Sequence, residues 1–279
     1  MLDVGESQRW CAAVMRDCAK SFYFSTRVLP KTKREAVEAL YGFCRFTDDV
    51  ADAPGPSTHE RLATFACIKR DLAGLASSRF EGRLPWYPAL RRAFGRFPIG
   101  LDDALRLVEG CESDLSPARM DSLERLEEYS SAVAGTVGRC SLPILGVADA
   151  DSLQRGERLG IAMQLTNILR DVEEDRLMGR VYLPLDAFPQ TSTGDVMTAV
   201  GLRARTYYRE ARVLAGRVPN DGSRVALLLT GAVYEGLLDR LEARRYDTTR
   251  GRAYVTLPQK VHLALRSLLD AYTGLATMR

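Results

Sequence analysis

Residues 41–52 read YGFCRFTDDVAD, and they combine an apolar background with polar side chains at helical spacing. Steps of four, three and four residues separate the polar members, which are Tyr41, Arg45, Asp48 and Asp52 (the first stripe). On an α-helix, side chains at these steps share one side. Because the rest of the segment is mostly apolar, we expect a helix buried on most sides, with its carboxylates facing an interior cavity. A solvated face, on which Arg45 simply pairs with a nearby aspartate, is the alternative.

Residues 164–175 read QLTNILRDVEED and repeat this arrangement. Steps of three, four and four residues separate Gln164, Asn167, Asp171 and Asp175 (the second stripe). If the two stripes face each other, they present at least four carboxylates and one amide oxygen to one cavity. Oxygen ligands of this kind suit Mg²⁺, particularly where substrate phosphate completes its coordination. Two unrelated charged helix faces are the alternative.

Helical periodicity extends over most of the chain, and alternating runs of β-branched residues are few, so we predict an all-α fold. The expected helices span residues 6–28, 32–52, 58–77, 86–97, 101–114, 121–146, 151–178, 195–217, 222–245 and 258–276. The length of 279 residues fits one or two domains. Because no flexible linker, repeat or low-complexity tract divides the helices, we predict one domain over residues 1–279.

Composition excludes several classes of protein. The 39 lysines and arginines nearly balance the 36 acidic residues, which argues against a dedicated nucleic-acid binder. Two histidines and no Cys-x-x-Cys pair argue against a zinc or transition-metal site, so any metal should have oxygen ligands. Six scattered cysteines favour a reduced interior, and the longest apolar run, near residues 225–233, is too short to cross a bilayer. We therefore expect a cytoplasmic protein.

Two glycines stand inside the expected helix 121–146. Gly135 and Gly138 each cost about 1 kcal/mol relative to alanine in a helix interior. They predict a kink or a close backbone approach at this point, with ordinary tight helix packing as the alternative.

Six motifs, taken in order, resemble those of the squalene/phytoene synthases over nearly the whole chain. They are SFYF at 21–24, LP at 29–30, LYGFCR running into DDVAD over 40–52, VAGTVG at 133–138, QLTNILRD at 164–171 and GRVYLP at 179–184. Two positions depart from the family pattern: Glu173 stands where glycine is common, and Ser130 where cysteine is common. The resemblance implies the helical isoprenoid synthase fold around a central cavity. It also implies head-to-head condensation of two prenyl diphosphates through a cyclopropylcarbinyl diphosphate.

The resemblance assigns roles to residues of both stripes. It implies Mg²⁺ ligation, with Mn²⁺ as a substitute, by Asp48, Asp52, Asn167, Asp171 and Asp175. Arg45 and Arg170 would hold diphosphate oxygens through their guanidinium forks. Further diphosphate contacts would come from Ser21, Tyr41, Gln164 and Tyr246, although Ser21 and Tyr246 could equally be a cap or a core hydroxyl. Lys20, Arg252 and Lys260 are additional basic candidates, and Phe22 belongs to the apolar wall that shields a carbocation from water.

The family resemblance offers one indication of the length of the substrate's prenyl chain, which is the size of the side chain at one position. Family members that form C30 products tend to place a bulky side chain where this chain has Thr26, one helical turn after Phe22. The smaller threonine favours two geranylgeranyl diphosphates giving phytoene. The alternative is two farnesyl diphosphates giving presqualene diphosphate, dehydrosqualene or squalene. We expect no use of NADPH.

Two other functions fit part of the same sequence. A terpene cyclase or a head-to-tail synthase would share the fold and the Mg²⁺ chemistry, but not normally the block at 164–171. A non-catalytic helical assembly factor of the same ancestry would be expected to lose the acidic stripes. Since prenyl chains are insoluble in water, we expect peripheral contact with the membrane, and no nucleic acid or required protein partner.

Overall fold

The computed structural model describes residues 2–77, 82–116, 120–185, 191–247 and 251–273. These residues form helices and contain no strand, which confirms the all-α prediction. In chain order the helices are α1 Val4–Cys18, α2 Lys20–Thr26, α3 Lys31–Asp52, α4 Thr58–Ala73, η1 Gly74–Ala76, α5 Tyr87–Arg96, α6 Leu101–Ser113, α7 Leu123–Ser130, η2 Ser131–Gly135, α8 Thr136–Leu145, α9 Ala150–Leu177, α10 Thr193–Ala211, α11 Leu214–Arg217, α12 Ser223–Ala243 and α13 Leu257–Thr273. Of these helices, none combines the length and the hydropathy that crossing a bilayer requires.

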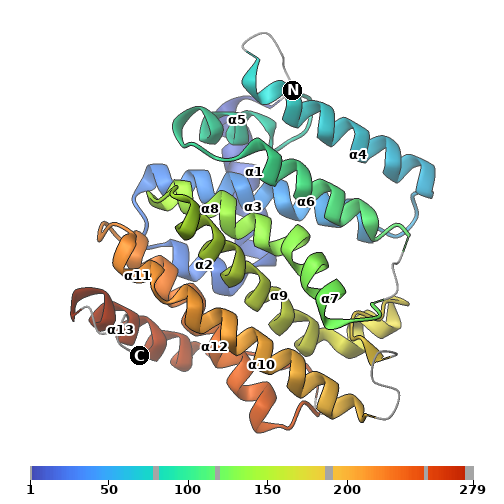
Figure 1. The fold of residues 1–279 in the computed structure, drawn as a ribbon. Helices are drawn as coiled ribbons and strands as arrows, with labels where there is room; N and C mark the ends of the chain where they lie inside the picture. The colour runs from blue at the N-terminus through green and yellow to red at the C-terminus, as the bar shows by residue number, and fades with distance from the viewer. Residues whose placement is uncertain (1, 78–81, 117–119, 186–190, 248–250, 274–279) are drawn as a thin grey trace.

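Helices α3 and α9 organise the packing of the others (Figure 1). α9 packs against α8, η2, α10 and α12, while α3 packs against α1, α5 and α8. Two groups of buried apolar side chains follow from this arrangement, one around α1, α3, α5 and α6 and the other around α9, α10 and α12. The polar stripes of α3 and α9 are thereby carried on helices whose other faces are held by the core.

The first expected helix, 6–28, is wrong as a single element. The chain breaks at Ala19, where φ is −128° and ψ is 56°. No glycine or proline marks this point in the sequence. α1 packs on α3 and α5, whereas α2 packs on α12, so the break turns the chain from one neighbour to the other. The expected helices 121–146 and 195–217 are also divided, into α7, η2 and α8 and into α10 and α11.

The glycines of 121–146 mark a close helix crossing, as predicted. A Cβ on Gly138 would lie 2.0 Å from the Gly156 carbonyl oxygen, and one on Gly160 would lie 2.2 Å from the Ala134 carbonyl oxygen. Residues Ser131–Gly135 form a π-helical turn at the same contact. Only glycine at these points lets η2 and α8 approach the α9 backbone so closely.

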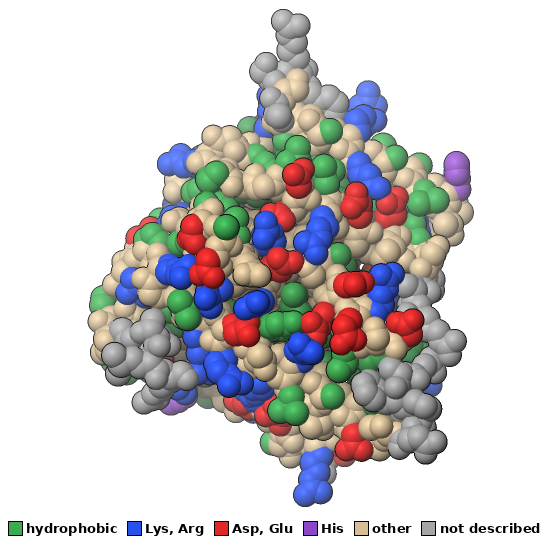
Figure 2. All heavy atoms as spheres, viewed as in Figure 1, with side chains coloured by type: hydrophobic (Ala, Val, Ile, Leu, Met, Phe, Trp, Pro, Cys, Tyr) green, Lys and Arg blue, Asp and Glu red, His purple; other side chains and the backbone are tan. Residues whose placement is uncertain are grey.

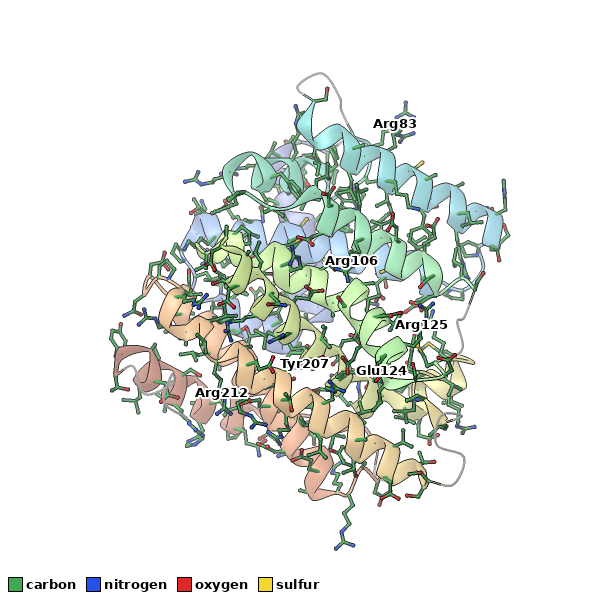
Figure 3. All side chains as sticks on the ribbon, in the orientation of Figure 1. Arg83, Arg106, Glu124, Arg125, Tyr207 and Arg212 are labelled. Carbon is green, nitrogen blue, oxygen red and sulfur yellow. The ribbon has the colours of Figure 1, made fainter. Side chains whose placement is uncertain are left out.

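Polar contacts across the surface reinforce this crossing. Arg106 of α6 donates to Ser131 Oγ at 2.6 Å and to Glu157 Oε1 at 3.3 Å, and so ties α6, η2 and α9 together (Figure 3). Tyr207 of α10 donates to Glu127 of α7 at 2.5 Å. On the face seen in Figure 2, acidic and basic side chains are interspersed, in keeping with the balanced composition.

Replacing Gly138 with alanine should destabilise the fold, because the added methyl group would overlap the Gly156 carbonyl. Overpacking of this kind costs about 1–3 kcal/mol. Gly231→Ala in α12 is the matched control, since open space surrounds its added group and alanine favours the helix by ~1 kcal/mol. Urea unfolding measures both changes, and equal stability of the two variants would contradict the close crossing.

Candidate active site

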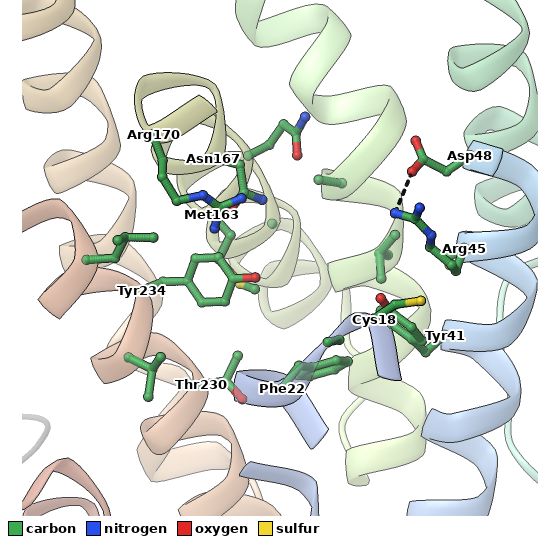
Figure 4. Close-up of a pocket in the computed structure, with 18 of the residues that line it drawn as sticks. Cys18, Phe22, Tyr41, Arg45, Asp48, Met163, Asn167, Arg170, Thr230 and Tyr234 are labelled. Carbon is green, nitrogen blue, oxygen red and sulfur yellow. Dashed lines mark hydrogen bonds and ion pairs between the residues drawn. The ribbon is translucent and has the colours of Figure 1, made fainter. Parts of the chain in front are cut away.

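A large cavity lies between α3 and α9, and side chains of α2, α8 and α12 complete its wall (Figure 4). Its volume is about 840 Å³. Figure 4 shows Arg45, Asp48, Asn167 and Arg170 toward one end, and Phe22 and Thr230 toward the other. The cavity thus has a polar end and a less polar end.

The structure brings both polar stripes to this cavity. The lining residues from α3 include Tyr41, Arg45, Asp48 and Asp52, and those from α9 include Gln164, Asn167, Arg170, Asp171 and Asp175. More than a hundred residues separate the two segments in the sequence. The facing arrangement is therefore a property of the tertiary structure, and it produces the concentration of carboxylates on which the Mg²⁺ hypothesis depends.

Arginines pair with several of these carboxylates. Arg45 donates to Asp48 Oδ2 at 3.4 Å and forms an ion pair with Asp49 at 2.6 Å. Asp171 accepts from Arg170 Nε at 2.6 Å and pairs with Arg252 Nε at 2.9 Å. These contacts offset part of the negative charge and hold guanidinium groups at the polar end of the cavity.

Arg180 is a site residue to which the sequence analysis assigned no role. It pairs with Asp52 across 128 positions of sequence and lines the cavity. Arg180 belongs to the GRVYLP motif, which supports the family resemblance but assigns this residue no role. Nothing in the local sequence connects this arginine with the first stripe.

A tyrosine pair also lines the cavity and was missed. The rings of Tyr129 and Tyr182 stack with centroids 5.0 Å apart, and Tyr129 donates a hydrogen bond to Asp114 at 3.0 Å. Burial raises the pKa of Asp114, against the lowering effect of the tyrosine hydroxyl and of Arg180. Tyr129 and Tyr182 stand 53 positions apart in the sequence, so helical periodicity could not have found this pair.

Two of the aspartates are held at unusual pKa values. Burial raises the pKa of Asp48 to about 6, and the negative charge of Asp52 adds to the effect. Burial also raises the pKa of Asp175 to about 6, with Asp171 as the next cause. The Asp48 side chain is half exposed and opens into the cavity. Both aspartates therefore lack a sufficient positive charge nearby.

Asn167 supplies a second sign of a missing ligand. Its Oδ1 atom is buried and accepts no hydrogen bond from the described residues. A buried amide oxygen without a donor is costly unless a ligand satisfies it. Carboxylates and an amide oxygen are the donors that Mg²⁺ prefers, so the residues present fit this ion. Among the described residues, no three histidine, cysteine, aspartate or glutamate side chains lie close enough together to hold a metal ion by themselves.

The remaining predicted residues divide into three groups. Phe22, Thr26, Lys20, Arg252 and Lys260 line the cavity. Tyr246 does not: its hydroxyl group packs against Gly201 of α10, and its backbone has φ of 56°. The left-handed turn after α12 directs this ring into the apolar group around α9, α10 and α12. The structure therefore does not place Tyr246 with the diphosphate contacts predicted for it. The Ser21 side chain lies outside the described residues.

Comparison with known proteins gives consistent results. The model of the family described as squalene/phytoene synthase matches residues 15–259. The chain is 31% identical to the 15-cis-phytoene synthase of Synechococcus elongatus, over 94% of the chain and 92% of that protein. It is 33% identical to phytoene synthase 3 of Zea mays over 90% of the chain, and it spans 63% of the length of that protein. Among solved structures, a dehydrosqualene synthase superposes with a TM-score of 0.85 at 28% identity, covering 97% of this chain and 98% of the other.

Asp48→Asn should stabilise the metal-free protein, because it removes a poorly solvated charge. When the pKa of a carboxyl group is higher in the folded than in the unfolded state, the free energy of unfolding of the protein falls as pH rises between the two pKa values. The gain should therefore be small at pH 4 and reach about 1 kcal/mol at pH 8, after allowing for access of water to the side chain. Glu173→Gln is the control, since Glu173 pairs with Arg176 on the exposed face of α9 and does not line the cavity, so this change should not stabilise. Thermal unfolding in EDTA at both pH values measures this, and a Tm gain for Asp48→Asn that does not grow with pH would contradict it.

Proposed function

Because the chain belongs to the squalene/phytoene synthase family of prenyltransferases, we propose that it condenses two prenyl diphosphates head to head in a Mg²⁺-dependent reaction. One observation carries the proposal: two carboxylate stripes on α3 and α9 face each other across a cavity whose other end is less polar. Family membership confirms the prediction of a prenyltransferase. The presence of both acidic stripes argues against a non-catalytic assembly factor of the same ancestry.

The polar end of the cavity is proposed to bind diphosphate. Asp48 and Asp52 from one side, with Asn167, Asp171 and Asp175 from the other, would hold the metal ions. Bound Mg²⁺ supplies Lewis-acid stabilisation of the charge that develops on a departing diphosphate. Arg45 and Arg170 lie beside these carboxylates, and each can offer a fork of donors to diphosphate oxygens. Tyr41 and Gln164 lie along the same stripes and are proposed as further contacts.

The remaining cavity is proposed to hold the prenyl tails and exclude water. In the reaction, loss of one diphosphate leaves an allylic cation. The double bond of the second substrate attacks it to give a new carbocation, which closes to a cyclopropane ring by losing a proton. The resulting cyclopropylcarbinyl diphosphate loses its own diphosphate and rearranges. Phe22 on α2 lines this part of the cavity and would shield the cation from water, which would otherwise quench it to an alcohol. We propose that the final cation loses a proton and accepts no hydride from NADPH.

Turnover should require a divalent cation and both stripes. Asp48→Ala and Asp171→Ala should each lower diphosphate release to background while the helical circular dichroism stays unchanged, because each removes a proposed ligand from one side. The matched control is Glu173→Ala on α9, since Glu173 pairs with Arg176 on the exposed face and does not line the cavity. Diphosphate release from prenyl diphosphates, with Mg²⁺ and with EDTA, is the measurement. Near-normal turnover of either folded aspartate variant would rule out the proposed site.

We propose geranylgeranyl diphosphate as the substrate and phytoene as the product. Thr26 lines the cavity and is 2% exposed, and its hydroxyl donates to the Tyr23 carbonyl at 3.0 Å. The similarity to phytoene synthases supports this choice. The similarity to a dehydrosqualene synthase keeps farnesyl diphosphate as the alternative.

Thr26→Phe should shift preference toward farnesyl diphosphate, because a ring at this position would shorten the space for the tails. A steric change of one pocket side chain alters discrimination by about 1–3 kcal/mol, or roughly 10–200-fold in kcat/KM. Thr26→Val, of nearly equal volume, should leave the preference unchanged. A competition assay with both substrates measures these ratios. A wild-type preference for the C15 substrate would refute the C20 assignment.

A further inference from the structure

Arg180 contacts both polar stripes at once. Its guanidinium group donates to Asp52 Oδ1, and its backbone N–H donates to the Asp175 carbonyl oxygen at 2.9 Å. Asp52 is the last member of the first stripe and Asp175 the last member of the second. One residue (the Arg180 link) therefore joins α3 to α9 where both stripes end.

The backbone of Arg180 is fixed by the end of α9. Gly179 has φ of 76°, and its N–H donates to the Arg176 carbonyl oxygen at 3.1 Å. Together with the bond from Arg180 to Asp175, this is the Schellman arrangement of a helix C-terminus. The arrangement needs a left-handed residue, which glycine adopts without strain. The Arg180 side chain therefore starts from a defined position beside the last turn of α9.

Tyr182 holds the same segment on its other side. Its hydroxyl group accepts a hydrogen bond from Tyr129 of α7 at 3.2 Å and donates to Asp114, which follows α6, at 3.5 Å. The Arg180 side chain is 18% exposed and that of Asp52 28%. The ion pair is thus anchored from both directions and largely shielded from water.

The far ends of the two stripes need such a link, because α3 and α9 are not extensive packing partners among the described helices. α8 packs on both of them. However, Gly160, the last glycine of the close crossing, precedes Asp171 by 11 residues, or about 16 Å along the helix. Beyond the crossing, the aspartates of the two stripes repel one another. A direct bond between the stripe ends opposes this repulsion.

We propose that Arg180 is a positioning residue that fixes the separation of the two stripes and thereby the metal site between them. Among the described residues, Arg180 alone bonds the Asp52 carboxylate, and it does so through Oδ1, so Oδ2 stays available to a metal ion. Loss of a residue that orients a metal ligand in this way lowers metal affinity by roughly 10–100-fold. The link itself is independent of the proposed function, whereas its use in metal binding rests on that function.

The charge of Arg180 and its position predict opposite effects when it is replaced. A positive charge beside carboxylates opposes the binding of a cation, so charge alone predicts that Arg180→Gln tightens metal binding. Loss of the link predicts weaker binding, because the ends of α3 and α9 would move apart under the repulsion of their aspartates. The direction of the change therefore distinguishes the two roles.

Mn²⁺ binding to the full chain measures this direction through the EPR signal of the unbound ion, with and without inorganic diphosphate. Arg180→Gln should weaken binding roughly tenfold or more. Arg180→Lys keeps the charge and one donor, so it should recover part of the loss. Arg176→Gln is the matched control and should leave binding unchanged. It removes the same charge from the same helix end, but Arg176 pairs with Glu173 on the exposed face and does not line the cavity.

A backbone variant tests the position of Arg180 without a change of charge. Gly179→Ala should also weaken Mn²⁺ binding, because alanine is strained at this left-handed position and would shift the residue that follows. Gly55→Ala is the matched control. Gly55 is also left-handed, and open space surrounds an added methyl group at both positions.

Hydrogen exchange of the protein in EDTA tests the link without any metal. Backbone amides of residues 47–53 and 170–177 should exchange faster in Arg180→Gln than in the wild type, because both helix ends lose a restraint. Arg176→Gln should exchange as the wild type does. Should Arg180→Gln fail to fold by circular dichroism, Arg180→Lys and Gly179→Ala carry both measurements.

Two outcomes would overturn the proposal: Mn²⁺ binding by the folded Arg180 variants that is as tight as that of the wild type or tighter, and unchanged exchange at both helix ends in EDTA. A different result would count against the proposed function alone. In that case exchange at the helix ends is faster in Arg180→Gln, but the wild-type chain binds no Mn²⁺ with or without diphosphate.

Discussion

Mutual repulsion among carboxylates in a partly desolvated cavity is the constraint on which the rest of this structure depends. Asp48 and Asp175 both have pKa values raised to about 6, because burial and neighbouring aspartates disfavour their charged forms. Arg45, Arg170 and Arg180 offset this charge only in part. The folded chain therefore maintains a site that attracts cations. This site lowers the stability of the fold, and packing elsewhere in the protein offsets the loss.

That packing comes from the apolar faces of α3 and α9, the helices that carry the carboxylates. α9 is held by the glycine contacts with η2 and α8, where Gly138 and Gly156 allow the two backbones almost to touch. This crossing determines the rotation of α9 about its own axis. That rotation in turn directs Asn167 and Asp171 into the cavity. The π-helical turn Ser131–Gly135 lies at the same crossing, in keeping with the frequent occurrence of such turns near functional sites.

Charge at the polar end of the cavity is mixed in sign. Inside the cavity, arginines and aspartates alternate, which suits a ligand that is itself a complex of metal ions and phosphate. The nearly neutral total charge of the chain gives no sign of this local arrangement.

The sequence by itself determined the helical class and the composition of each polar stripe, because the 3.6-residue period assigns side chains to one face without reference to the rest of the fold. It also indicated the close crossing, because glycine inside a helix is less favourable than alanine and therefore points to a packing constraint. Only the tertiary structure decided that the two stripes face each other, that Arg180 reaches Asp52, and that the chain turns at Ala19. It also directed Tyr246 away from the cavity, through a left-handed turn after α12. These features depend on contacts between segments far apart in sequence, and no local pattern encodes the relative rotation of two packed helices.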